Sequence, residues 1–250
     1  MLFRTVYGPE LDSVFFWLQN NGPATIKQML NIFGANIEGQ KKSSSANLED
    51  ALNFLEASGL IKKDNRGYLT VQKFPDDLQF KLALLNQMRT LQVKRKSQNV
   101  LDPFFLGALD LLFIKPNVLF RSELHGSINS LELPVPCSEE KVNAWKRVLE
   151  YLGVGIRGYG GFLTLYNTEL VMTIIEQWSE TSGPIQQLLE EHFDKYLPWK
   201  THRGDVSSAL SVPLEILEKR GSIKLQAKQD LPSKSYLGTR KVKWIERGDF

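Results

Sequence analysis

Apolar side chains recur along this chain at the spacing of one helical face. Leu48, Leu52 and Leu55 lie at positions i, i+4 and i+7, which predicts one stripe of an α-helix. Gly59 follows this stripe and suits the left-handed residue that often ends a helix. Two short stretches of alternating polarity come next, and a polar turn at residues 64–67 separates them. This pattern predicts a helix followed directly by a β-hairpin.

The helix-to-hairpin pattern recurs at a fixed offset. Leu-Glu-Ala-Ser-Gly at 55–59 matches Leu-Glu-Tyr-Leu-Gly at 149–153, an offset of 94 residues. The same offset carries Gly-Tyr-Leu-Thr-Val at 67–71 onto Gly-Phe-Leu-Thr-Leu at 161–165. A third copy of the first motif, Leu-Glu-Lys-Arg-Gly, occupies 217–221. Two motifs at one offset indicate an internal repeat.

Two further helical patterns precede the motif in each copy, on either side of a breaker. The helices are expected around 11–18 and 26–33 in the first copy, 103–115 and 119–131 in the second, and 170–178 and 185–193 in the third. The breakers are Gly22-Pro23, Pro116-Asn117 and Gly183-Pro184. Each copy therefore predicts three helices and a hairpin. Pro213 falls inside the third helix of the third copy and predicts a kink or a split there.

Three helices and a hairpin, with a glycine after the third helix, resemble the winged-helix branch of the helix-turn-helix superfamily. The resemblance implies an α+β, mainly α fold of three tandem winged-helix units at residues 1–75, 102–167 and 168–250. It also implies that a third helix enters a DNA groove and that the hairpin, or wing, touches the DNA backbone. Residues 76–101 carry a further apolar stripe and predict a connecting helix, with membrane or partner-helix binding as the alternative.

The net charge of +3 is modest, but its distribution is uneven. Residues 168–194 contain six acids and no Lys or Arg, whereas residues 195–250 contain twelve Lys or Arg and six acids. Such a swing predicts a polarised surface in the third unit. Since the wing of this unit is expected to be long, at residues 226–242, we expect the third unit to make the main contact with DNA.

The residues expected to contact nucleic acid lie before the third helices and in the wings, because phosphates are bound by Lys, Arg, hydroxyl and amide donors. In the first unit they are Lys41, Lys42, Ser45 and Asn47. In the third unit they are Lys200, His202, Arg203, Ser207, Ser208, Lys228, Lys234, Arg240, Lys241 and Lys243. Asp205 is the expected N-cap of the third helix, and Trp244 is expected in the core.

Acidic third helices support a second hypothesis. Glu49 and Asp50 in the first copy, and Glu139 and Glu140 in the second, would repel phosphate. Tandem winged helices also serve as subunits of larger assemblies. The alternative is therefore a protein-interaction adaptor that docks a partner through apolar helix faces. Under the DNA-binding hypothesis the first unit makes a secondary contact, and the second unit acts as a spacer or a dimerisation unit.

Catalytic and metal-binding patterns are weak in this sequence. His125, His192 and His202 are widely separated, and there is no His-Glu-x-x-His or Cys-x-x-Cys. Cys137 lacks an identifiable base partner and is expected to be an inert thiol. The glycines at 158–161 match a wing turn and lack the Gly-Lys-Ser/Thr of a phosphate loop. We expect no enzymatic activity, no cofactor and no metal.

Membrane partners are not expected either. No apolar run approaches the roughly 20 residues that span a bilayer, and the N-terminus lacks the pattern of a signal peptide. The single cysteine excludes an internal disulfide and predicts a reducing compartment, the cytoplasm or, in a eukaryote, the nucleus.

Overall fold

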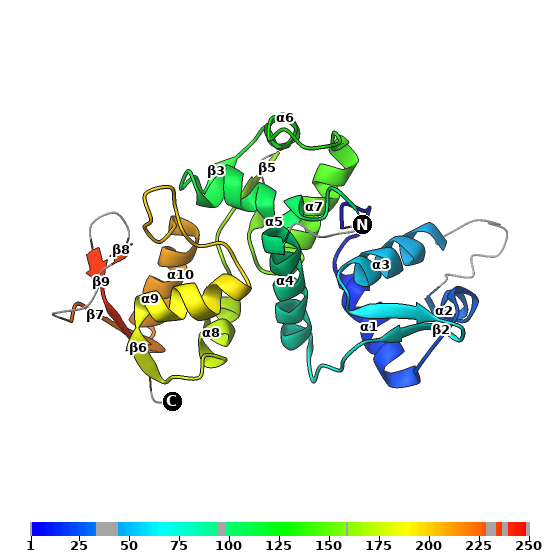
Figure 1. The fold of residues 1–250 in the computed structure, drawn as a ribbon, viewed down its shortest axis with the longest axis horizontal. Coiled ribbons are helices and arrows are strands. Elements are labelled where there is room, and N and C mark those ends of the chain that lie inside the picture. The colour runs from blue at the N-terminus through cyan, green and yellow to red at the C-terminus, as the bar shows by residue number, and fades with distance from the viewer. Residues whose placement is uncertain are drawn as a thin grey trace. The chain divides into compact units, whose positions relative to one another are not determined.

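The computed structural model describes residues 2–33, 45–94, 99–158, 160–228, 234–236 and 240–248. About 52% of the described residues are helical and 15% lie in strands, so the fold is α+β and mainly α. Two compact units are present (Figure 1): the first comprises Met1–Phe105 and Pro134–Leu152, and the second comprises Leu106–Leu133 and Gly153–Phe250. Residues 102–167, expected to form one unit, contribute segments to both.

The first unit contains helices around a short hairpin. Its elements are α1 (Pro9–Asn21), α2 (Ile26–Phe33), α3 (Ser45–Ala57), β1 (Ile61–Asp64), β2 (Gly67–Thr70), α4 (Asp77–Lys94), the start of α5 (Phe104–Leu109) and α7 (Glu139–Tyr151). The predicted stripe of α3 is confirmed, because Leu48, Leu52 and Leu55 are all buried. The hairpin is confirmed as well, with Ile61 paired to Thr70.

An aromatic cluster joins α4 to α1 within the first unit. The ring of Phe15 lies 4.9 Å from that of Phe80 and 5.4 Å from that of Phe74, measured between centroids. Contacts at this separation add to the free energy of burying apolar surface. The helix predicted within residues 76–101 is present as α4 at Asp77–Lys94; residues 95–98 lie outside the described part, and residues 99–101 are not helical.

The second unit contains more elements, most of them short. They are η1 (Asp110–Ile114), β3 (Phe120–Arg121), α6 (Leu124–Asn129), β4 (Ile156–Gly158), β5 (Gly161–Leu163), α8 (Thr168–Glu176), β6 (Ser182–Pro184), α9 (Ile185–Gln187), η2 (Leu188–His192), η3 (Phe193–Lys195), α10 (Ser208–Lys219), β7 (Ile223–Gln226), β8 (Lys234–Tyr236), β9 (Arg240–Val242) and β10 (Trp244–Arg247). Figure 1 shows β7, β8 and β9 beside one another at one end of this unit. No helix in the described part of the chain is long and apolar enough to cross a membrane.

The strands of each sheet are antiparallel. Two of the sheets contain a short strand, β3 or β6, that the sequence pattern did not predict. The strand orders are β3-β5-β4, β6-β10-β7 and β8-β9. In the first unit, Ala24 makes an equivalent bridge to Tyr68 of β2. Each of these extra strands lies between the first two helices of a copy, where the sequence pattern indicated only a breaker. With three residues or fewer they are too short to show an alternating pattern.

With these short strands included, the same order of helices and strands occurs three times along the chain. Each copy has a helix, a short strand or bridge, further helical segments and then two strands, the last of which lies between the other two; in the third copy the pair β8-β9 is inserted between these two strands. The central strand is β2 in the first copy, β5 in the second and β10 in the third. A left-handed glycine follows the third helix in every copy, with φ of 76° at Gly59, 76° at Gly153 and 78° at Gly221. The predicted C-caps are thus confirmed.

Helix α10 departs from two expectations. It continues through Pro213 as one helix rather than splitting. The carbonyl that proline leaves without its usual partner is that of Ala209, and it accepts a hydrogen bond from the Tyr166 amide at 3.1 Å. The N-cap is Ser207 rather than Asp205. The first helical amide, of Ser208, donates to Oδ1 of Asn117 at 2.7 Å, so a distant side chain does the capping.

Candidate nucleic-acid interface

The sheet β6-β10-β7 has one buried face and one outward face. Ile245 of β10 pairs with Leu225 of β7, and both side chains are buried. Because side chains alternate along a strand, the neighbouring Trp244 lies on the opposite face, in register with Gln226 and Pro184. The expectation that Trp244 belongs to the core is wrong: its side chain is half-buried, and Ile245 takes the core position.

Several lysines lie on or beside this sheet. Lys224 is exposed on β7, and the ammonium nitrogen of the exposed Lys228 lies 3.4 Å from the ring centroid of Trp244. Lys243 is half-buried, and its amide donates to the Gln226 carbonyl at 2.9 Å. Lys241 is exposed on β9. The side chains of Lys224 and Lys241 are thus exposed to solvent, with Glu246 opposite Lys224 in the sheet, whereas that of Lys243 is partly covered.

Arg240, one of the cations expected in the wing, is instead bound within the protein. Its two terminal nitrogens bind both carboxylate oxygens of Glu218 on α10, and Nη2 also donates to the Leu225 carbonyl at 2.9 Å. The amide of Leu225 donates back to Oε1 of Glu218 at 3.2 Å. The Arg240 hydrogen bonds lower the pKa of Glu218. Arg240 therefore joins β9 to α10 and β7, and a phosphate contact would require breaking this ion pair.

Three residues expected to contact nucleic acid, Lys200, His202 and Arg203, lie in the loop before α10. Lys200 Nζ lies 3.9 Å from a Glu190 carboxylate oxygen and 5.8 Å from the Trp199 ring centroid. His202 and Arg203 are exposed in the turn that follows.

The two serines at the start of α10 are poorly placed for a ligand. Ser207 is only 1% exposed, so its hydroxyl does not reach the surface, which disfavours the predicted phosphate contact. Ser208 is half-buried, and its amide is already bound to Asn117. The start of α10 therefore offers little to a phosphate.

Some expected contacts cannot be placed. Lys41 and Lys42 lie outside the described residues, and so do the side chains of Ser45 and Lys234, whose backbones begin α3 and β8. Asn47 is exposed on α3, where it borders a pocket instead of a basic surface.

This pocket, of about 460 Å³, lies among α1, α2 and α3 of the first unit. Its lining is mostly apolar and consists of Tyr7, Pro9, Glu10, Ser13, Val14, Leu30, Phe33, Asn47, Leu48 and Ala51. Beside it, α2 buries only Met29, while Ile32 is 59% exposed and Phe33 is 37% exposed. An amphipathic helix normally buries its apolar face, so α2 leaves apolar surface available.

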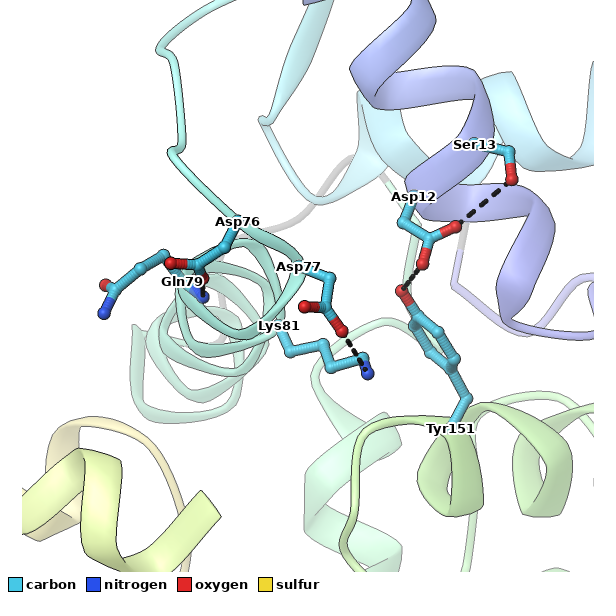
Figure 2. A network of polar contacts seen from close by, with 7 residues as sticks. All are labelled: Asp12, Ser13, Asp76, Asp77, Gln79, Lys81 and Tyr151. Carbon is cyan, nitrogen blue, oxygen red and sulfur yellow. Dashed lines mark hydrogen bonds and ion pairs between the residues drawn. The ribbon is translucent and has the colours of Figure 1, made fainter. Parts of the chain in front are cut away.

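A polar network in the first unit has a structural rather than a chemical character. Figure 2 shows the Tyr151 hydroxyl of α7 donating to Oδ2 of Asp12 on α1, at 3.0 Å. Lys81 of α4 lies 4.7 Å from the Tyr151 ring centroid and forms an ion pair with Asp77. Burial, and then the charge of Asp12, raise the pKa of Tyr151 far above its usual value. The hydroxyl therefore stays protonated near neutral pH and serves as a donor.

Other reactive groups are buried. Burial raises the pKa of the Cys137 thiol, which disfavours the nucleophilic thiolate. Burial lowers the pKa of His192, whose Nε2 lies 2.6 Å from the Ile174 carbonyl oxygen. Among the described residues, no group of three or more His, Cys, Asp or Glu is placed to hold a metal ion.

Sequence reasoning missed several residues of this surface. Lys219, Arg220 and Lys224 are exposed at the end of α10 and on β7. Lys224 lies between the apolar residues Ile223 and Leu225, and this alternation could have identified it as an outward position on a strand. The capping role of Asn117 had no such signal, because it depends on a contact 91 residues away.

Comparison with known proteins finds no family model, no curated protein and no solved structure that matches this chain. The function is therefore inferred from the geometry of the structure alone.

Proposed function

We propose that this chain is a non-enzymatic nucleic-acid-binding protein built from three tandem winged-helix units. The recurring order of elements supports the repeat, since each copy places its last strand between the other two. In a winged helix the hairpin after the third helix contacts the nucleic-acid backbone.

The observation that carries the binding proposal is the set of outward cations on the third copy. They are Lys219, Arg220, Lys224, Lys228, Lys241 and Lys243. They extend from the end of α10 across β7 to the strands that return from the wing. The nearby carboxylate of Glu218 is paired with Arg240, whereas that of Glu246 accepts a hydrogen bond from the neutral Gln226 at 3.2 Å and keeps its charge opposite Lys224, so the cations outnumber the unpaired acids. A polyanion would meet a positive surface here.

The test is fluorescence anisotropy with a labelled duplex of random sequence, measured at several salt concentrations. We expect binding that weakens steeply with salt, because each neutralised phosphate contributes about 0.9 to the slope of log K against log salt. Replacing Lys241 and Lys243 together by Ala should lower that slope by up to about 2.

A matched control removes two exposed lysines of the first unit that lie outside its hairpin, Lys73→Ala with Lys94→Ala, and causes the same change in net charge. The control should leave the slope close to that of the unmodified chain. No binding of either this duplex or a single strand of equal length at low salt, or equal losses in the two double variants, would contradict the proposed surface.

The adaptor function remains a second candidate because of the apolar surface on α2. Ile32 and Phe33 are exposed beside a mostly apolar pocket, which is typical of a surface that docks a protein partner. A photo-reactive amino acid placed at Ile32 should crosslink one protein partner in cells, whereas the same group at Lys27, exposed on the same helix, should not. Equal products from both positions would count against docking at α2.

A further inference from the structure

The outward face of β6-β10-β7 combines an aromatic ring with cations. Trp244 lies at the centre of a row that runs from Pro184 on β6 to Gln226 on β7. The next row on this face has Glu246 at its centre and Lys224 at its edge, and the Lys228 ammonium lies over the Trp244 ring. Nucleobases stack on such rings, and lysines bind the phosphates that flank a stacked base.

The contact between Lys228 and the Trp244 ring is weak enough for a nucleobase to replace it. A cation over an indole ring at a solvent-exposed site contributes only a modest free energy. Lys228 follows the last residue of β7, and its side chain is exposed. A base could therefore take the place of the ammonium group on the ring, and the lysine could then pair with a phosphate of the same strand.

Helix α10, the counterpart of a groove-reading helix, is poorly suited to a DNA duplex. Its incompletely buried positions include Val212, Glu215 and Ile216. Valine and isoleucine offer no hydrogen bond to base edges, and glutamate repels phosphate. The start of the helix is closed by the bond from the Ser208 amide to Asn117. The outward sheet face also carries an acid, Glu246, but it offers an aromatic ring for stacking and the exposed Lys228 beside that ring, which the helix lacks.

We propose that this sheet face binds single-stranded nucleic acid, with one base stacked on Trp244 and flanking phosphates at Lys224 and Lys228. The inference rests on the proposed nucleic-acid-binding function and specifies its substrate class. It makes the strand face, rather than α10, the main contact of the third copy.

The experiment compares the full-length chain with Trp244→Phe and Trp244→Leu variants. The probes are a fluorescein-labelled oligothymidine of about 20 nucleotides and a duplex of equal length. We expect the unmodified chain to bind the single strand at least tenfold more tightly than the duplex. The leucine variant should lose roughly five- to a hundredfold in single-strand affinity, whereas the phenylalanine variant should retain most of it.

Tryptophan emission gives a second measurement that does not depend on the leucine variant folding. The difference in emission between the unmodified chain and Trp244→Phe reports on Trp244, and it should decrease when oligothymidine binds. Trp17→Leu, at a half-buried tryptophan of the first unit, is the matched control and should bind as the unmodified chain does.

The outcomes separate the two proposals. If neither probe binds, the proposed function fails, and this inference fails with it. If the duplex binds as tightly as the single strand, or if single-strand affinity and emission are independent of Trp244, nucleic-acid binding stands and the stacking site is overturned.

Discussion

The hydrogen bond from Tyr151 to Asp12 allows a sharp prediction about the first unit. Tyr151→Phe removes the hydroxyl and keeps the ring, which packs against Gly8 and lies beneath Lys81. Hydrogen bonds to charged groups contribute about 1.5–3 kcal/mol, and solvent screening reduces this figure for a partly buried bond. We expect a loss of about 1–2 kcal/mol in the free energy of unfolding at pH 7.

The assay is urea unfolding of Tyr151→Phe, Asp12→Asn and the double variant, followed by circular dichroism. A double-mutant cycle should give a coupling free energy of about 1 kcal/mol between the two residues. Tyr196→Phe is the control, because its hydroxyl donates to the neutral side chain of Gln177 at 2.9 Å and should contribute less. A cycle with zero coupling, or a larger effect from the control, would refute the assignment.

The stability that the Tyr151–Asp12 hydrogen bond contributes depends on pH, and the raised pKa of Tyr151 determines the direction of this dependence. Burial and Asp12 raise the pKa of Tyr151 in the folded state, whereas tyrosine in the unfolded chain titrates near pH 10. Stability from this group is therefore fully present below about pH 10 and is lost as the pH rises above that value. The advantage of the unmodified chain over Tyr151→Phe should shrink between about pH 9 and pH 10.5. A constant advantage would contradict the raised pKa.

Three further substitutions have expected outcomes that urea unfolding can check. Asn117→Ala should cost about 1 kcal/mol by removing the cap of α10, and Asn117→Asp should retain most of the stability. Gly67→Ala should cost about 2 kcal/mol or more, because φ is 125° and the new Cβ would lie 2.3 Å from the Ala24 carbonyl oxygen; Gly22→Ala, with no atom within 4 Å, should cost less. Burial lowers the pKa of His192, so stability should fall as the pH drops below about 6.5, and His192→Gln should weaken this dependence.

Local patterns were sufficient to predict the helices that end in glycine. The stripe of Leu48, Leu52 and Leu55 is buried, and Gly59 has the left-handed conformation that ends the helix. Both features depend on residues within one or two helical turns, so periodicity and side-chain chemistry determine them. The hairpin that follows is equally local, since its strands are joined by a short turn.

Features that depend on tertiary contacts could not be predicted in this way. A proline inside a helix usually breaks it, yet α10 continues because the Tyr166 amide binds the carbonyl of Ala209. Trp244 belongs to an alternating segment, and alternation identifies two faces without showing which one is buried. The register with β7 settles the question, because Ile245 pairs with the buried Leu225. Both outcomes depend on residues distant in sequence.

At the proposed interface, the sequence also does not show which cations are available to bind phosphate, because this depends on tertiary contacts. Arg240, Lys241 and Lys243 have equal weight in a sequence count, but Arg240 forms a neutral pair with Glu218. An intramolecular carboxylate is present at a high effective concentration, so phosphate competes poorly for this guanidinium. Arg240→Ala should thus change nucleic-acid affinity by displacing the wing while leaving the salt slope unchanged. A slope lowered by about 0.9 would instead assign Arg240 to a phosphate contact, because one counterion-releasing interaction would have been lost.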